Sequence, residues 1–167
     1  MAEMTSPMDL FEHELRDILY AERQIEKTLP KLAKEASDPD LQEAFTRHRD
    51  ETRQQIANLE RVFEIIGKAP RGTRCPGIEG LMTEHDEFVS DENPAAEILD
   101  VFLTGAGARV EHYEIAAYTG LVTAATALGQ KEAADLLQEN LRQEKDTLSR
   151  LEALGTGLLK TAAAATA

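Results

Sequence analysis

The sequence is poor in cysteine, in aromatic residues and in positive charge. Its single cysteine, Cys75, excludes an intramolecular disulfide and a cysteine cluster that would hold zinc or an iron–sulfur centre. The 18 Lys and Arg residues against 31 Asp and Glu give a net charge of −13, which disfavours non-specific binding to nucleic acid and to anionic membranes. We therefore expect neither nucleic acid nor a membrane as a partner.

Long apolar runs and strand patterns are also missing. No stretch approaches the roughly 18 apolar residues of a membrane span. Residues 1–9 lack the basic segment and the apolar run of a secretory signal, which favours a cytoplasmic protein. No alternating run of β-branched residues is long enough for a strand, and only 5% of the chain is aromatic. The fold is therefore predicted to be all-α, and 167 residues fit one domain.

Four long helices are predicted from apolar residues that recur at helical spacing and from the residues that begin and end them. Ser6-Pro7, Ser37-Asp38-Pro39 and Asn93-Pro94 each place a capping residue before a proline, as at helix starts. Gly67 and Gly129 end the second and third helices. The expected helices span residues 8–36, 39–66, 94–128 and 130–158.

The crossover 67–93 between the second and third helices is unusually long. It is rich in glycine, proline and charge, and a short amphipathic piece around Ile78 and Leu81 predicts one small helix. A connection of this length can return along a whole helix, so helix 94–128 can run parallel to helix 39–66. The prediction is a four-helix bundle over residues 8–158, made of two antiparallel hairpins joined by the crossover. The ends, 1–7 and 159–167, are expected to be flexible.

Two glutamates, Glu111 and Glu114, interrupt the apolar stripe of the third helix. Because they are three residues apart, they lie on one face of a helix, one turn from each other. Burial of both ionised carboxylates would cost several kcal/mol unless a partner, a shared proton or a metal ion compensates their charge. Glu22, Glu51 and Glu144 interrupt the stripes of the other three helices in the same way.

The five glutamates all fall near the midpoints of their helices, so a bundle with matched ends places them in one layer. Five carboxylates cannot all be ionised and unpaired in an apolar layer, and divalent cations would compensate them. We therefore predict a centre of two divalent metal ions, Fe or Mn, with Glu51 and Glu144 as bridging ligands. The predicted carboxylate ligands are Glu22, Glu51, Glu111, Glu114 and Glu144.

Each of these residues also has a purely structural interpretation. A single glutamate on a helix is usually solvated, so only the alignment of four helices favours a metal centre. His48, one turn before Glu51, is either a sixth ligand or a buried histidine beside the ligands. Gln55 is expected beside the ligands or in the polar core instead of as a ligand, His112 on a flank or interface, and Tyr118 in bundle packing.

Several short segments together form a pattern that is more specific than any single residue. They include Tyr20-Ala21-Glu22, His48-Arg49-Asp50-Glu51, Arg61-Val62-Phe63, Cys75-Pro76-Gly77-Ile78 and, most specifically, Val110-Glu111-His112-Tyr113-Glu114. With these segments the chain resembles the ferritin-like proteins of the YciE/YciF type over about residues 8–155. The resemblance implies a ferritin-like fold, a homodimer, association with the stress response, and a di-metal site comparable to that of rubrerythrin, whose third helix also carries Glu-x-x-Glu. It implies no established reaction and no electron donor.

The chain departs from the wider rubrerythrin and ferritin pattern on two helices. Gln54, Gln55, Thr147 and Leu148 stand where those proteins have histidine, which implies a site poor in nitrogen ligands. Two functions remain open: a di-iron or di-manganese oxidoreductase that reacts with peroxide or oxygen, and a non-catalytic structural or stress bundle with weak or no metal binding. Iron storage in a shell is less favoured, because the short loops show no added assembly element.

Overall fold

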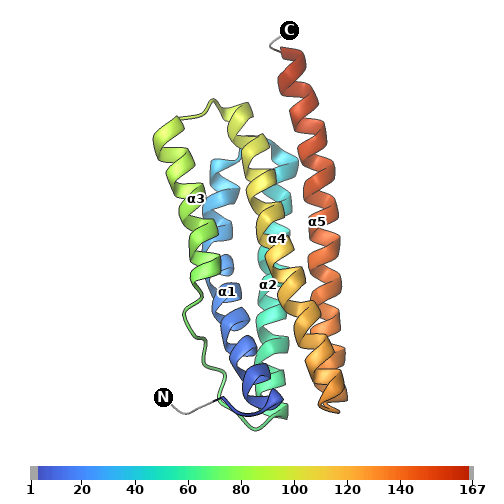
Figure 1. The fold of residues 1–167 in the computed structure, drawn as a ribbon. Coiled ribbons are helices and arrows are strands. Elements are labelled where there is room, and N and C mark those ends of the chain that lie inside the picture. The colour runs from blue at the N-terminus through green and yellow to red at the C-terminus, as the bar shows by residue number, and fades with distance from the viewer. Residues whose placement is uncertain (1–3, 166–167) are drawn as a thin grey trace.

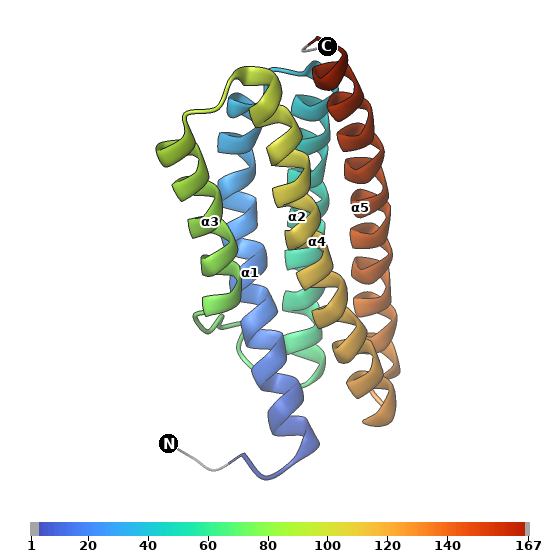
Figure 2. The ribbon, with the colours of Figure 1, turned by 45° about the horizontal axis from the view of Figure 1, so that its top comes forward.

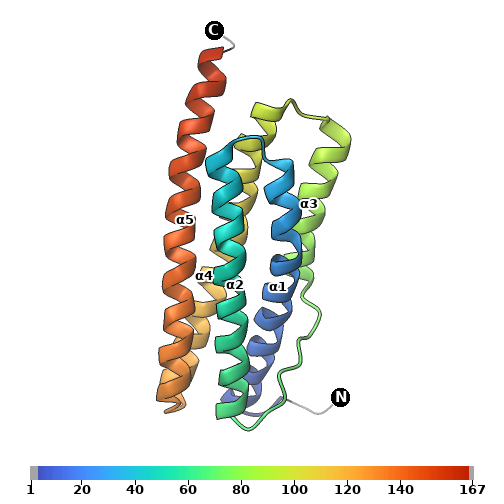
Figure 3. The same ribbon diagram turned by 180° about the vertical axis from the view of Figure 1, so that it is seen from behind.

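The computed structural model describes residues 4–165 and is all-helical over that range (Figure 1). The helices are α1 (Pro7–Glu35), α2 (Pro39–Ile65), α3 (Pro76–Glu92), α4 (Ala96–Ala127) and α5 (Lys131–Ala165). Hairpin α1–α2 packs against hairpin α4–α5, and the crossover that carries α3 lets α4 run parallel to α2 (Figure 1, Figure 3). The predicted four-helix bundle with a short extra helix is confirmed.

The first hairpin begins at two capped helix ends. The Ser6 hydroxyl accepts the backbone N–H of Asp9 at 3.2 Å, and the Asp9 carboxylate accepts the N–H of Ser6 at 2.9 Å, forming a capping box. Asp38 caps α2 with a single bond of this kind, in which its carboxylate accepts the N–H of Leu41 at 2.9 Å. The buried Asp100 of α4 then accepts the N–H groups of Ser37 at 2.8 Å and of Asp38 at 3.0 Å. A carboxylate of the second hairpin thus fixes the turn of the first.

Two helix ends differ from the sequence prediction. Asn93 does not begin the third long helix, because it ends α3 in the left-handed conformation, with φ of 44°, which asparagine tolerates better than most residues. α4 begins at Ala96 instead. α5 continues to Ala165, through part of the tail expected from residue 159, since alanine is the strongest helix former. Residues 1–3 and 166–167, which belong to the ends expected to be flexible, lie outside the described residues.

α3 packs beside α1 and α4 on one side of the bundle (Figure 2). Ile78 at its start is fully buried, and the ring of Phe88 stacks on Phe102 of α4 with centroids 3.7 Å apart. Near its middle, Asp86 accepts a hydrogen bond of 2.6 Å from Lys31 Nζ of α1. The crossover therefore forms an additional wall of the bundle.

The interior is apolar toward both ends and polar in the middle. Phe45 and Leu59 flank the polar layer on α2, and Leu103 and Leu121 flank it on α4. Among the helices of residues 4–165, none has the length and apolar character that crossing a bilayer requires. The buried polar side chains of the layer include Glu22, His48, Thr52, Gln55, Glu111, Glu114, Asn140 and Glu144.

Candidate metal centre

Four side chains from three helices converge in the middle of the bundle. His48 lies on α2, Glu111 and Glu114 on α4, and Glu144 on α5. One possible ligand atom from each of these residues lies within 4.8 Å of the other three, and all four residues are at most 4% exposed. The i,i+3 spacing on α4 places both of its carboxylates on the face that points inward. This group is called the buried cluster below.

Most of the polar atoms in the buried cluster have no hydrogen-bond partner. His48 Nε2 lies 3.2 Å from Glu111 Oε1, yet neither imidazole nitrogen makes a hydrogen bond within residues 4–165. Both carboxylate oxygens of Glu114 and one oxygen each of Glu111 and Glu144 also lack partners within the described chain. Buried polar groups are normally paired, so these atoms call for a compensating ligand.

Glu22 of α1 lies next to the buried cluster but outside the group of four. It is completely buried, and the Tyr118 hydroxyl donates a hydrogen bond to its Oε1. Its Oε2 has no partner among the described residues. Its charge is close enough to raise the pKa values of Glu114 and Glu144, after the larger effect of burial. Glu22 therefore adds a free carboxylate oxygen to the same layer.

Glu51 lies at the edge of the layer instead of inside it. Its side chain is 23% exposed and accepts hydrogen bonds from Arg150 Nη2 at 2.8 and 3.0 Å and from Thr147 Oγ1 at 3.1 Å. Glu51 Oε2 lies 3.9 Å from Nδ1 of His48, a member of the cluster. The structure therefore brings five of the six predicted ligands into one layer and holds the sixth in an ion pair.

A chain of amides and one phenol supports the cluster from α2, α4 and α5. Gln55 Nε2 donates to Glu144 Oε1, and Asn140 Nδ2 donates to the Tyr118 hydroxyl at 3.1 Å. Asn58 Nδ2 in turn donates to Asn140 Oδ1 at 2.8 Å. Gln55 was expected in the polar core, whereas the roles of Asn58, Asn140 and Tyr118 were missed. Their only signal in the sequence is a polar or phenolic side chain on the inward stripe.

Burial and mutual repulsion shift the pKa values of this layer. Burial raises the pKa of Glu22 to about 8, and it raises those of Glu114 and Glu144 well above the ordinary value. Burial acts on Glu111 in the same direction, but the charge of His48 outweighs it and holds the pKa low. Burial opposes protonation of His48, yet the Glu111 carboxylate raises the pKa of the imidazole well above its ordinary value. Without a cation, the layer thus favours one ion pair and protons on the remaining carboxylates.

The donor set fits a divalent metal ion. Three carboxylates and one imidazole offer oxygen and nitrogen ligands of the kind that Fe and Mn accept. Gln55 and Tyr118 orient the carboxylates by hydrogen bonds, as residues that surround metal ligands commonly do. The carboxylate oxygens that lack hydrogen-bond partners are free to coordinate a cation.

Two other residues that the sequence draws attention to, His112 and Cys75, lie outside the cluster. His112, one residue from Glu111, is exposed on α4, as expected for a flank. Cys75 is buried, and its Sγ lies 2.9 Å from the hydroxyl of Tyr113, which donates a hydrogen bond of 2.7 Å to Asp17. This contact joins the start of α3 to α4 and α1.

The chain is similar to known proteins over most of its length. The profile of a family described as a domain of unknown function, DUF892, matches residues 6–164. Protein YciF of Escherichia coli (strain K12) is 39% identical over 140 residues, which are 83% of this chain and 84% of that protein. The solved structure of the Escherichia coli stress protein YciF matches with a TM-score of 0.89 and 37% identity, covering 94% of this chain and 99% of that one. YcfI of Rhodopseudomonas palustris, described as a candidate structural protein, matches with a TM-score of 0.87 and 40% identity, covering 90% and 95%.

Proposed function

Because this chain belongs to the DUF892 family, and because its bundle buries a histidine–carboxylate cluster, we propose that it is a cytoplasmic, stress-associated protein with a di-metal centre. The centre would bind two Fe or Mn ions and react with peroxide or oxygen. The stress association is proposed from the solved relative, which is described as a stress protein.

The observation that carries the proposal is the set of unpartnered atoms in the buried cluster. A buried glutamate without a hydrogen bond is costly, and Glu114 has two free oxygens within the described residues. A structural role alone would be better served by apolar side chains of similar size, since these remove the burial cost altogether. The presence of three buried carboxylates beside one imidazole therefore favours a role in cation binding.

The residues divide into holding and orienting groups. His48, Glu111, Glu114 and Glu144 would hold one ion, and Glu22 Oε2 provides a further oxygen in the same layer for the second. Bound Fe or Mn would supply the electrons that reduce peroxide or oxygen. Protons on the carboxylates must leave when a cation binds, so binding should release protons and weaken at acidic pH.

Aerobic addition of Fe(II) tests this function. A redox-active centre is expected to give a diferric absorption band in the near ultraviolet that saturates with added iron. Glu111→Gln should remove the band, whereas Glu43→Gln, an exposed position on α2, should leave it unchanged. Absence of the band in the unaltered protein, together with no metal by elemental analysis, would reject the proposal.

The second candidate function is a non-catalytic structural bundle. The ion pair between Glu51 and Arg150 favours it, because this pair engages a carboxylate that a second ion could otherwise use. The description of YcfI as a candidate structural protein agrees with this alternative.

We also propose that the protein forms a homodimer, as the family resemblance implies. Sedimentation equilibrium would show one chain per particle if that proposal is wrong.

A further inference from the structure

A pocket of about 180 Å³ lies between the crossover helix and the bundle. Its walls come from all five helices and are mainly apolar. The side chains that give it this character include Leu29, Phe45, Leu81, Met82 and Val110. Nothing in the fold requires a space of this size, and interiors of proteins are otherwise close-packed.

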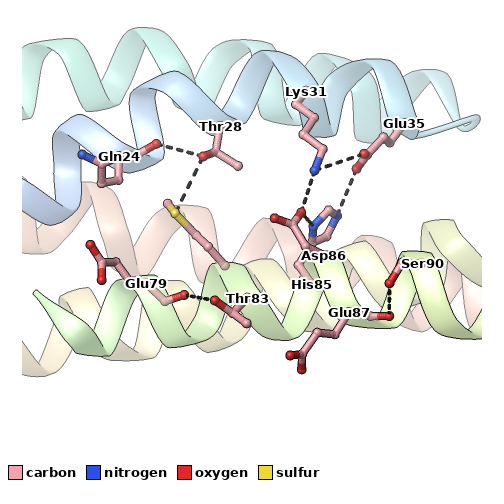
Figure 4. A network of polar contacts seen from close by, with 11 residues as sticks. Gln24, Thr28, Lys31, Glu35, Glu79, Thr83, His85, Asp86, Glu87 and Ser90 are labelled. Carbon is pink, nitrogen blue, oxygen red and sulfur yellow. Dashed lines mark hydrogen bonds and ion pairs between the residues drawn. The ribbon is translucent and has the colours of Figure 1, made fainter.

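The pocket reaches from the surface to the buried cluster. Lys31 and Asp86, with side chains 52% and 63% exposed, line its outer part, where they form an ion pair across α1 and α3. His85 joins this rim by contacts of 3.0 Å with Asp86 and with Glu35 (Figure 4). The inner part is lined by His48 and Glu111, which are almost completely buried. One cavity therefore contacts both solvent-exposed groups and two candidate ligands.

The inner end of the pocket carries free hydrogen-bonding atoms, whereas the walls between it and the rim are mainly apolar. Both imidazole nitrogens of His48 and Oε2 of Glu111 lack hydrogen-bond partners in the described part of the chain. A molecule with one terminal O–H group could satisfy one of them while its remaining surface contacts the apolar walls. An apolar cavity of about 150 Å³ stays dry and binds benzene, so one aromatic ring or a short alkyl chain matches this space.

We propose that this pocket binds a compact alkyl or aryl molecule that ends in an O–H group, the class to which alcohols and organic hydroperoxides belong. The O–H group meets His48 and Glu111, and the apolar part lies against Leu81 and Met82. The assignment of such a molecule as substrate rests on the proposed function. Its binding does not, because the pocket is formed by side chains alone.

Binding of 4-fluorobenzyl alcohol to the full-length, chelated protein tests the pocket. Fluorine NMR should show saturable broadening or a shift of the ligand signal. Ala106→Leu adds side-chain volume to the wall and should weaken binding at least about tenfold, since the loss of close contacts removes the benefit of apolar burial. Ala116→Leu, at an exposed position of the same helix, should bind like the unaltered protein.

If Ala106→Leu fails to fold, Thr28→Met provides a second way to fill the pocket from α1. Failure of the unaltered protein to bind would overturn the inference, and so would equal binding by a folded filling variant. The analogue 4-fluorotoluene lacks the O–H group and should bind about tenfold more weakly, the effect of one hydrogen bond. Equal affinity of the two probes would contradict the placement of the O–H group at His48 and Glu111.

Manganese separates this inference from the proposed function. In protein loaded with Mn(II), the fluorine signal of the bound alcohol should relax much faster, because the pocket ends at the cluster. If the unaltered protein binds the alcohol but does not bind Mn(II), only the proposed metal centre is rejected. Bound Mn(II) without enhanced relaxation of bound alcohol would reject only the proposed pocket occupancy.

Discussion

Arg150 of α5 donates two hydrogen bonds to the carboxylate of Glu51 on α2, at 2.8 and 3.0 Å. The same arginine nitrogen donates to Thr147 Oγ1 at 2.7 Å, and Thr147 Oγ1 donates to Glu51 at 3.1 Å. Thr147 therefore contacts both members of the ion pair. The Glu51 side chain is 23% exposed, against 1% for Glu111. Two glutamates that were both predicted to be metal ligands thus have different environments.

This difference predicts unequal effects of the same substitution on metal affinity. Glu111→Gln should weaken Mn(II) binding at least about tenfold, because it removes a buried charged ligand. Glu51→Gln should weaken binding less, since Arg150 already occupies its carboxylate. Calorimetric titration of both variants with Mn(II) measures the difference. Equal losses would show that Glu51 leaves Arg150 and binds metal.

The phenol of Tyr118 is expected to be essential for the stability of the layer. Tyr118→Phe removes the donor to Glu22 and the acceptor of Asn140, both of which are buried, and should lower the free energy of unfolding by about 1–3 kcal/mol. Tyr20→Phe is the matched control, because Tyr20 donates to the less buried Glu79, and it should lower the free energy of unfolding less than Tyr118→Phe does. Urea melts of the metal-free proteins compare them. A smaller effect at Tyr118 than at Tyr20 would disagree with the network described here.

Asp100 should stabilise the connection between the two hairpins. Asp100→Asn replaces the charged acceptor of the Ser37 and Asp38 N–H groups and should lower the free energy of unfolding by about 1.5–3 kcal/mol. Asp135→Asn removes only a surface ion pair with Lys131 and should cost about 0–1 kcal/mol. Thermal melts of both variants measure the difference. Indistinguishable melting temperatures would mean that the turn is held by other contacts.

The metal-free protein is expected to lose stability as pH rises toward 8. Burial raises the pKa of Glu22 from 4.5 to about 8 and shifts those of Glu114 and Glu144 in the same direction. Between pH 4.5 and about 8 the folded protein thus binds more protons than the unfolded chain, so its free energy of unfolding falls as pH rises. The raised pKa of His48 also makes stability fall as pH rises. The lowered pKa of Glu111 has the opposite effect on stability, but only below its ordinary value of 4.5.

Urea melts of chelated protein at about pH 5 and pH 7.5, two points near the ends of this window, measure the effect. Saturating Mn(II) should abolish or reverse the trend, because a cation stabilises the ionised carboxylates and competes with their protons. A triple variant with Glu22, Glu114 and Glu144 changed to Gln should show a weaker dependence on pH. If chelated protein were more stable at pH 7.5 than at pH 5, the raised pKa values would be contradicted.

The fold could be predicted from the sequence because its signals are local. Apolar stripes with a period near 3.6 residues and the caps at Ser6 and Asp38 locate helices without knowledge of their partners. Asn93-Pro94 misled the prediction because asparagine is common at helix starts and also adopts the left-handed conformation that ends a helix. In this chain Asn93 ends α3. Four of the five predicted glutamates lie in one buried layer, since residues at helix midpoints meet in a matched bundle, whereas Glu51 lies at its edge.

The partners of the glutamates could not be predicted in the same way. Arg150 and Asp100 are single charged residues on helices, where such residues are usually solvated, and no spacing rule connects them with Glu51 or Ser37. Rotation of each helix about its axis decides which carboxylates point inward, and that rotation is set by packing of all five helices. The pocket beside His48 likewise depends on where the crossover helix lies against the bundle.

Titration of the purified, chelated protein with Mn(II) under anaerobic conditions tests the central claim most directly. We expect binding to saturate at two ions per chain, with release of protons, because the layer contains more carboxylate oxygens than one ion requires. Glu114→Gln should reduce the number of bound ions or their affinity, while Glu43→Gln should not. Saturation at one ion per chain would contradict the di-metal centre, and equal binding by Glu114→Gln would contradict the site.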